Sequence, residues 1–395
     1  MDAQTLKSEL QSELFRILDY WMEHTIDHAN GGFVGELDHQ NQVREGAPKG
    51  AVLNARILWT FSAAYRRFPE KEYLRTAKRA YEYMTARFVD REHGGVFWTL
   101  DENGEVLSDR KQIYALAFTI YGCVEYYRAC GHEKALELAI ELFRVIETYS
   151  FDPVNNGYLE ALRRDWSPLE DVRLSEKDEN ALKTMNTHLH ILEAYTNLYR
   201  VWKGDSLKQA LKNLIEVFLH RILRKNRSFG LFFDEQWKLS SGNISFGHDI
   251  EGSWLLHEAA VVLGETDLLS EVERTAIQMA EKVAKGGVSR DFAVLEELHV
   301  ATGEQDHYRH WWPQAEGIVG FYNTFELSGE ERYLELACRI WGYTKANIID
   351  RENGEWFWKA DSEGNPSQDE YKVGLWKCPY HNGRACLEII GRVAS

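Results

Sequence analysis

Cysteine is scarce in this chain of 395 residues, and its five copies are scattered without a CxxC pair. An odd number of widely spaced cysteines fits neither a disulfide framework nor a zinc cage, and is typical of reduced thiols in a cytoplasm. No run of about 18 apolar residues occurs. The acidic, amphipathic N-terminus also lacks the basic start and apolar core of a signal peptide. We therefore expect a soluble, cytoplasmic protein with no membrane partner.

Clusters of basic residues are also missing, because 46 Lys and Arg face 62 Asp and Glu, a formal net charge of −16. Nucleic-acid binding needs a basic face, so nucleic acid is excluded as a partner. HExxH, P-loop, GxSxG and strand-borne GxGxxG motifs are absent. Their absence excludes zincin, nucleotide-binding and α/β-hydrolase readings, and ATP is not implied. The charge suits a small neutral or cationic ligand and a monomer.

Aromatic residues, by contrast, are abundant, and they recur in short glycine-containing segments. Alternating aromatics followed by a turn predict a short β-hairpin in each copy of this signature. Five clear copies and one weaker copy span 30–43, 93–107, 155–169, 229–240, 353–367 and, the weaker one, 286–298. Successive copies begin roughly one sixth of the chain apart, which indicates a sixfold internal repeat.

Two helical patterns lie between successive hairpin signatures. The predicted pairs are 51–68 with 71–88, 111–130 with 133–149, 182–202 with 206–223, 248–263 with 267–285, and 309–327 with 331–347. A sixth pair joins 4–25 to the helix that starts at Tyr380. Helix pairs that cannot bury their apolar stripes alone stack on their neighbours. We therefore predict an all-α fold: one catalytic domain, residues 1–395, built as an (α/α)6 barrel of twelve helices with hairpins at one rim.

The segment SFGHDIEGSWLLHEA, residues 245–259, combines a helix start with titratable groups. Ser245 is the expected N-cap, and Glu251 follows His248 by three residues, on the same helix face. Glu251 can therefore accept a ring proton from His248 and aim its other nitrogen, as a general base requires. The alternative is a helix-capping histidine with a salt-bridging glutamate.

Further polar residues interrupt helices that are otherwise apolar enough to be buried. Arg56 needs either a structural carboxylate partner or a place facing the cavity as an oxyanion clamp. A second helix carries a polar stripe on one face, formed by Asn186, His190, Glu193 and Asn197. His188 lies on another face, and the alternative for both histidines of this helix is a satisfied core position.

His381 begins the last inner helix much as His248 begins its own. Two histidines from different repeats on one rim favour catalysis over packing. Nearby tryptophans, Trp312 and Trp376, are either core residues or sugar platforms. Hydrolysis also stays open, because an inverting glycosidase needs two carboxylates, and candidates are Asp178, Glu251 and Glu316.

Five segments, NARILWTF, MNTHLHILEAY, SFGHDIEGSWLL, RHWWPQAE and WKCPYHNGRACLE, resemble the N-acylglucosamine 2-epimerase superfamily across nearly the whole chain, most closely its members that act on cellobiose. The resemblance implies an (α/α)6 barrel whose reaction needs neither a redox cofactor nor a metal. It also implies reversible inversion at C2 of the reducing-end glucose of β-1,4-linked disaccharides, which converts cellobiose to glucosyl-mannose and lactose to epilactose. Alternatives are an N-acylglucosamine 2-epimerase, a mannose-type aldose-ketose isomerase, an (α/α)6 glycoside hydrolase, and a non-catalytic sugar-binding module.

The resemblance also implies roles for single residues. His248 and His381 correspond to the two acid/base histidines, Arg56 to the support of the enediolate oxygen, His190 to a third essential histidine, and Glu251 to the partner of the base. The substrate-binding group comprises Tyr114, Asp178, Asn186, Trp312 and Trp376, to which we add Glu316. This set suits the reaction, since a proton leaving C2 needs a base, an oxyanion donor, and an acid on the opposite face.

Overall fold

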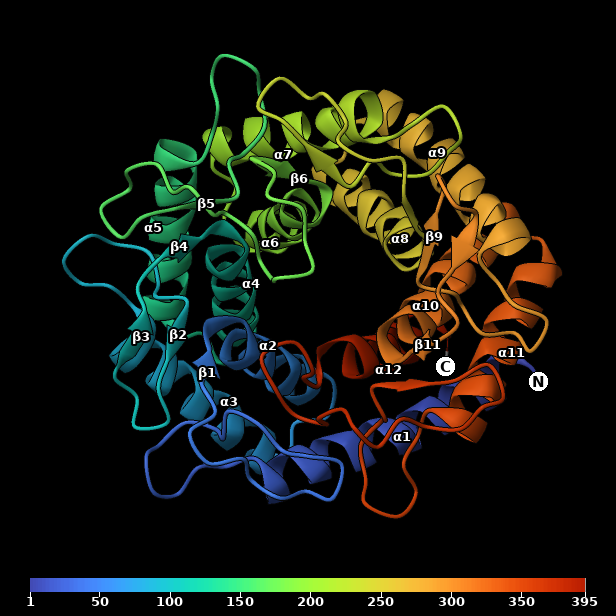
Figure 1. Ribbon diagram of the computed structural model, residues 1–395, viewed down its shortest axis with the longest axis horizontal. Helices are drawn as coiled ribbons and strands as arrows, with labels where there is room; N and C mark the ends of the chain where they lie inside the picture. The colour runs from blue at the N-terminus through green and yellow to red at the C-terminus, as the bar shows by residue number, and fades with distance from the viewer. Residues whose placement is uncertain (395) are drawn as a thin grey trace.

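The computed structural model describes residues 1–394 as a closed ring of helices (Figure 1). Ser395, the last residue of the predicted domain, lies outside the described part. The inner ring consists of α2 (Ala51–Arg67), α4 (Ile113–Cys130), α6 (Met185–Val201), α8 (Phe246–Leu263), α10 (Trp311–Ser328) and α12 (Tyr380–Arg392). The outer ring consists of α1 (Ala3–His24), α3 (Lys71–Tyr83), α5 (Glu133–Tyr149), α7 (Asp205–Val217), α9 (Thr266–Gly286) and α11 (Glu331–Asn347). Two outer helices, α3 and α7, end in π-helical turns, η1 (Met84–Phe88) and η2 (Phe218–Ile222).

The ring closes because every inner helix packs against the inner helices on both sides. Contacts run from α2 through α4, α6, α8 and α10 to α12, which returns to α2. The first helix, α1, packs against α12, so the two ends of the chain complete the sixth pair. Within residues 1–394 the predicted (α/α)6 barrel of twelve helices is therefore confirmed.

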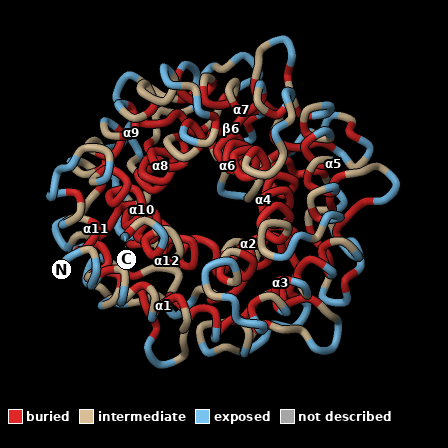
Figure 2. Tube along the Cα trace, turned by 180° about the vertical axis from the view of Figure 1, so that it is seen from behind, coloured by how far each residue is buried: buried red, intermediate tan, exposed pale blue. Residues whose placement is uncertain are grey.

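Burial differs between the two rings (Figure 2). The outer helix α9 buries one stripe, Val272, Ala276, Met279 and Val283, at helical spacing. Inner helices are buried nearly all round, and α4 is buried continuously from Ile113 to Tyr126. A polar side chain on an inner helix must therefore have a partner or face the central cavity.

Short antiparallel strands hold the rim at which the inner helices begin. The strands are β1 (Lys49–Gly50), β2 (Thr99–Leu100), β3 (Val106–Ser108), β4 (Lys111–Gln112), β5 (Ala161–Leu162), β6 (Lys183–Thr184), β7 (Phe232–Phe233), β8 (Ile244–Ser245), β9 (Glu297–His299), β10 (Glu304–Gln305), β11 (Arg309–His310) and β12 (Lys359–Ala360). Five of them directly precede an inner helix, so the strands and the N-termini of these helices share one end of the barrel.

Strand pairing is partly as predicted. Five of the six hairpin signatures close through a single bridge, for example Leu162 with Pro168 or Val288 with Val294, and the signature at 93–107 closes as the regular pair of β2 with β3. The regular strands, however, mostly pair between neighbouring repeats: β1 with β2, β4 with β5, β6 with β7, β8 with β9, and β11 with β12. The sequence pattern did not predict this pairing, which ties the start of one inner helix to the next repeat. Among the described helices, none is both long and apolar enough to cross a membrane.

Candidate active site

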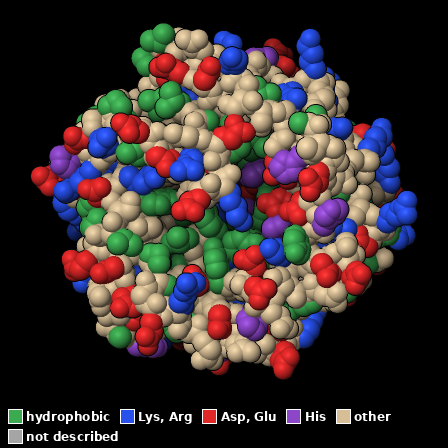
Figure 3. Space-filling view, viewed as in Figure 1, with side chains coloured by type: hydrophobic (Ala, Val, Ile, Leu, Met, Phe, Trp, Pro, Cys, Tyr) green, Lys and Arg blue, Asp and Glu red, His purple; other side chains and the backbone are tan. Residues whose placement is uncertain are grey.

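The predicted site residues on inner helices lie close to the strand-bearing rim. Arg56, His190, Glu251 and Glu316 are each the sixth residue of their helix, while Tyr114 and His381 are each the second. Side chains from all six inner helices therefore converge on one end of the barrel. Figure 3 shows this face, which is hollowed near its centre, with acidic, histidine and hydrophobic side chains around the hollow.

His248 lies at the start of α8, where Ser245 caps the helix as predicted. The Oγ of Ser245 accepts the backbone N–H of His248 and lies 2.7 Å from its Nδ1. Because a hydroxyl can donate or accept, this contact allows either tautomer of the ring. Burial lowers the pKa of His248 to about 4, so the imidazole is neutral at pH 7.

The predicted pairing of Glu251 with His248 is wrong. Oε1 of Glu251 instead accepts a hydrogen bond of 2.6 Å from Nη2 of Arg384, which reaches it from α12. A guanidinium is a stronger donor to a carboxylate than a neutral imidazole is. The serine cap meanwhile occupies Nδ1 of His248. Glu251 therefore belongs to the surroundings of His381, whose Nδ1 lies 3.9 Å from its Oε1.

His381, at the start of α12, has a closer carboxylate partner than His248 does. Its Nδ1 lies 2.7 Å from Oε1 of Glu316. Burial, together with the nearby charges of Arg56 and Arg384, lowers the pKa of His381 well below its usual value. The ring is therefore neutral, and an ionised Glu316 would hold its hydrogen on Nδ1 and leave the lone pair on Nε2.

Trp312 joins the two histidines. Its ring centroid lies 4.7 Å from that of His248 and 5.7 Å from that of His381. Trp311 packs on Trp358, with centroids 4.4 Å apart, and its ring lies 6.4 Å from that of His381 without contacting His248. Of the two neighbouring tryptophans, Trp312 therefore borders the histidines, and histidines from two different helices share one aromatic neighbour.

The polar stripe of α6 divides between two environments. Nδ1 of His190 lies 3.0 Å from Oε2 of Glu193, and burial lowers the pKa of this histidine to about 4. One turn earlier, Oδ1 of Asn186 is buried and has no hydrogen-bond partner among the described residues. Asn197, at the other end, bonds to Glu125 and Arg128 and is structural. The rim half of the stripe thus remains available to a ligand.

His188 occupies the satisfied core position that the alternative reading described. Its Nδ1 lies 2.6 Å from the carbonyl oxygen of Thr184, and its Nε2 accepts the backbone N–H of Tyr158 at 2.9 Å. Both ring nitrogens are therefore used within the fold. Two histidines only two residues apart on α6 thus have different surroundings.

Arg56 is a buried cation without a carboxylate partner among the described residues. Its Nη2 donates to the hydroxyl of Tyr114 at 2.8 Å, and its Nη1 to the carbonyl of Trp376 at 3.4 Å. Its guanidinium packs against the rings of Phe118 and Tyr380. The Nε hydrogen has no partner within residues 1–394. Of the two interpretations of Arg56, the structural ion pair is excluded, because an aromatic cage replaces the carboxylate.

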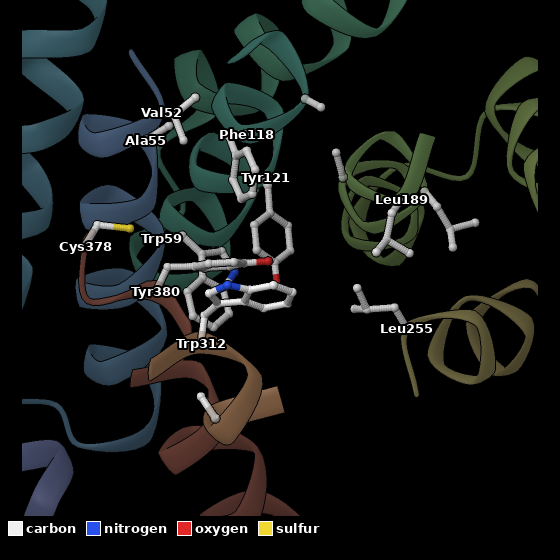
Figure 4. Close-up of a cluster of buried hydrophobic side chains, with 14 of the residues drawn as sticks. Val52, Ala55, Trp59, Phe118, Tyr121, Leu189, Leu255, Trp312, Cys378 and Tyr380 are labelled. Atoms are coloured by element: carbon white, nitrogen blue, oxygen red, sulfur yellow. The ribbon is translucent and has the colours of Figure 1, made fainter. Parts of the chain in front are cut away.

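Sequence reasoning overlooked two residues of α12, Tyr380 and Arg384, which lie close to His190 and His381. Tyr380 donates to Glu193 at 2.5 Å, and Figure 4 shows its ring among Trp59, Phe118 and Tyr121. Arg384 bonds to Glu193, Glu251 and Glu316 together. The available signal was the arginine of PYHNGR, which follows His381 by three residues on a helix too apolar to leave a charge unpaired.

Two clusters are dense enough in ligand atoms to hold a metal ion. They are Glu251, Glu316 and His381, and Glu296, Asp306 and His310. In the first, Arg384 already bonds to both carboxylates. In the second, burial opposes protonation of His310, but the two carboxylates outweigh it and raise its pKa to about 9. A protein cation therefore occupies each cluster, and neither fits a resident metal.

The remaining predicted substrate-binding residues lie in loops at the rim. Trp376 is half-buried, with its ring 6.0 Å from Tyr114 and 5.8 Å from Trp98. Asp178 lies in the loop before β6, where its Oδ2 accepts hydrogen bonds from the N–H and hydroxyl of Ser175. Trp376 thus adjoins the Arg56 side of the site, whereas contact of Asp178 with a sugar stays a prediction.

Known proteins resemble this chain over nearly its whole length. The model of the N-acylglucosamine 2-epimerase family matches residues 31–385. The cellobiose 2-epimerase of Bacteroides fragilis is 50% identical, covering 98% of this chain and 99% of its own. That of Dictyoglomus turgidum is 37% identical over 100% of both chains. The solved structure of cellobiose 2-epimerase from Bacillus thermoamylovorans superposes with a TM-score of 0.94, at 40% identity, over 99% of this chain and 100% of that one.

Proposed function

The chain belongs to the N-acylglucosamine 2-epimerase family, and from this membership we propose that it inverts C2 of the reducing-end glucose of β-1,4-linked disaccharides. The enzyme is thus a carbohydrate isomerase that interconverts cellobiose with glucosyl-mannose and lactose with epilactose. The observation that carries the proposal is a pair of neutral histidines, His248 on α8 and His381 on α12. Both pack against Trp312 of α10, the helix that lies between α8 and α12.

The reaction requires an open-chain sugar, because the C2 hydrogen is acidic only beside a C1 carbonyl. One histidine removes this hydrogen, and the other returns a proton to the opposite face of the planar enediolate. A neutral imidazole can take the first role. The second histidine, also neutral at rest, takes up a proton from solvent beside the negatively charged enediolate and then donates it to C2, while the first returns the C2 proton to solvent, so that the protons balance. For His381, the carboxylate of Glu316 behind Nδ1 stabilises the positive charge that appears when Nε2 takes the proton.

Arg56 supplies the positive charge for the enediolate oxygen. Since it has no carboxylate partner among the described residues, its charge is available to a substrate anion. Tyr114 orients the guanidinium through its hydroxyl. The free Oδ1 of Asn186 accepts a sugar hydroxyl, and His190, held by Glu193, contributes a further neutral imidazole. Trp312 and Trp376 offer two separate aromatic faces, enough for two sugar rings.

A glycoside hydrolase is disfavoured by the state of its candidate carboxylates. Inverting hydrolysis needs an acid and a base on opposite sides of the glycosidic bond. Here Glu251 and Glu316 bind the same Arg384 guanidinium, and Glu316 also supports His381. Both are therefore held in one buried group behind the histidines. The monosaccharide-specific family reactions would leave the aromatic surface around Trp376 and Trp98 without a role.

The direct test is to incubate the enzyme with cellobiose and with lactose and to separate the products by chromatography. We expect glucosyl-mannose and epilactose, with no monosaccharide. Deuterium placed at C2 should be lost to solvent water during turnover. Free glucose would identify a hydrolase, and a ketose alone would identify an isomerase. A C2 label that is fully retained would contradict the proton-transfer scheme.

The proposal also includes a cytoplasmic monomer in which the whole chain is one catalytic domain. The described residues contain five free cysteines, which suit a reducing compartment. One continuous apolar core joins residues from α1 to α12. Size-exclusion chromatography with light scattering should give about the 45.9 kDa of a single chain, and a larger mass would replace the monomer with an oligomer.

A further inference from the structure

Arg384 lies one turn after His381 on α12, and 1% of its side chain is exposed. Its Nη2 donates to Oε1 of Glu251 at 2.6 Å and to Oε1 of Glu316 at 2.7 Å. Its Nη1 donates to Glu193. A guanidinium from α12 therefore holds carboxylates from α6, α8 and α10, and one of these carboxylates, Glu316, contacts His381.

Glu316 connects Arg384 to His381 through a single atom. The Oε1 that accepts from Arg384 is also the oxygen 2.7 Å from Nδ1 of His381. An ionised carboxylate can only accept hydrogen bonds, so it requires hydrogen on Nδ1 and leaves a lone pair on Nε2. A protonated Glu316 can donate to Nδ1 instead, which would move the ring hydrogen to Nε2. In that tautomer His381 cannot accept a proton from the sugar.

Burial and the nearby Glu193 oppose the ionisation of Glu316, whereas Arg384 and the indole N–H of Trp254 favour it. Burial raises the pKa of Glu316, and the Arg384 charge is the largest influence that lowers it. The groups that face its carboxylate are Glu251 and the indole N–H of Trp254 from α8, Glu193 from α6, and His381 and Arg384 from α12. Three carboxylates that are almost fully buried share this one guanidinium. Removing a buried partner leaves charges that cannot remain ionised at low cost.

Resting on the proposed two-histidine reaction, we propose that Arg384 is a positioning residue that keeps Glu316 ionised and thereby keeps His381 in the tautomer with hydrogen on Nδ1. It acts through Glu316 and does not contact the sugar. The same guanidinium holds Glu193, whose other oxygen lies 3.0 Å from Nδ1 of His190. One arginine thus sets the orientation of two of the three site histidines.

The test combines tautomer and rate measurements on Arg384→Met, Arg384→Lys and, as the matched control on the same helix, Arg392→Met. Arg392 bonds to Glu326 and Glu388 at the other end of α12. Nitrogen-15 NMR of the full chain labelled at histidine, with His381 assigned by comparison with His381→Asn, reports which ring nitrogen carries hydrogen. Steady-state kinetics with cellobiose gives kcat and KM separately.

In the wild type and in Arg392→Met, His381 should carry hydrogen on Nδ1. In Arg384→Met the hydrogen should move to Nε2, and kcat should fall by about 10²-fold with little change in KM. Arg384→Lys keeps a cation and should restore part of kcat. The lysine ammonium holds Glu316 less well than the guanidinium does, so the pKa of Glu316 should be higher in Arg384→Lys. The acid limb of the plot of kcat against pH for this variant should therefore move to higher pH.

Three results separate this proposal from the proposed function. An unchanged His381 tautomer in folded Arg384→Met would overturn the role of Arg384, whatever the activity. If Arg384→Met does not fold, the test rests on Arg384→Lys. The role of Arg384 would then be overturned if this variant had the same His381 tautomer and the same acid limb of kcat as the wild type. A wild type that does not epimerise cellobiose but shows the Arg384-dependent tautomer would refute the proposed function and leave the positioning role intact.

Discussion

The Nδ1 of His381 and the Oε1 of Glu316 lie 2.7 Å apart. The two residues are on neighbouring inner helices, and both side chains are almost completely buried. Within residues 1–394, His248 has no such carboxylate and is paired with the hydroxyl of Ser245. The two histidines therefore differ in how their hydrogens are held. The Glu316 pair fixes one tautomer, whereas the Ser245 pair permits both. This asymmetry distinguishes the two sides of the proposed enediolate.

Replacement of either histidine by alanine should abolish epimerisation. We expect His248→Ala and His381→Ala each to lower kcat for cellobiose by about 10²- to 10⁴-fold, the usual contribution of a positioned acid or base. His220→Ala, on the exposed surface of η2, is the matched control and should keep full activity. Circular dichroism should show that all three variants fold. Robust turnover in both site variants would rule out the two-base scheme.

Each single variant should still exchange the C2 hydrogen of one epimer. A remaining histidine can remove and return the proton on its own face, which labels the sugar without inverting it. In deuterium oxide, we expect His248→Ala to exchange the C2 hydrogen for deuterium in only one of the two epimers, cellobiose or glucosyl-mannose. We expect His381→Ala to exchange the C2 hydrogen of the other epimer. Proton NMR of the recovered sugars measures this. Exchange of both epimers by one variant would indicate a single base.

Activity should persist below the pH at which an ordinary histidine becomes protonated. Burial lowers the pKa of His248 and of His190 to about 4, and lowers that of His381 well below its usual value. The neutral form is the one present above the pKa, so it remains as pH falls from 7 to about 5. We expect kcat/KM for cellobiose to be nearly constant over this range. A tenfold loss for each pH unit below about 6.5 would show that a base titrates normally.

Loss of the Arg56 charge should affect the reaction rather than the fold. Arg56→Met should lower kcat by about 10²- to 10³-fold, as removal of an oxyanion donor does elsewhere. Arg66→Met, on the same helix but at the far end of the barrel, breaks the bond to Glu125 and is the control. Its kcat should stay close to wild type. Equal losses in both variants would assign Arg56 a structural role.

A methyl group at Gly247 should displace Trp312 from the histidines. A Cβ placed there would lie 2.3 Å from Cη2 of Trp312, too close for the ring to keep its place. We expect Gly247→Ala to raise KM for cellobiose by roughly tenfold and also to lower kcat. Each tenfold change in kcat/KM corresponds to about 1.4 kcal/mol of lost transition-state stabilisation. Gly342→Ala on α11 meets no atom within 4 Å and is the control. Unchanged kinetics in Gly247→Ala would remove Trp312 from the substrate site.

Much of the site was accessible from the sequence because its evidence is local. The spacing of apolar residues predicts the twelve helices, and the repeat predicts their grouping into six pairs. Ser245, three residues before His248, predicts the helix cap that the structure has. The stripe on α6 predicts that His190 and Glu193 meet, since residues three apart share a helix face.

Contacts across the barrel depended on the tertiary structure. The same three-residue spacing predicted His248 with Glu251, yet Arg384 is 133 positions away in the chain and takes that carboxylate. Glu316, kept in the sequence analysis as a substrate-binding or hydrolytic carboxylate, becomes the partner of His381 because α10 and α12 pack side by side. The chain pattern specifies which side chains share a helix face. Closure of the ring brings together helix faces that are far apart in the sequence. It therefore decides which charged groups meet and which histidine has a carboxylate partner.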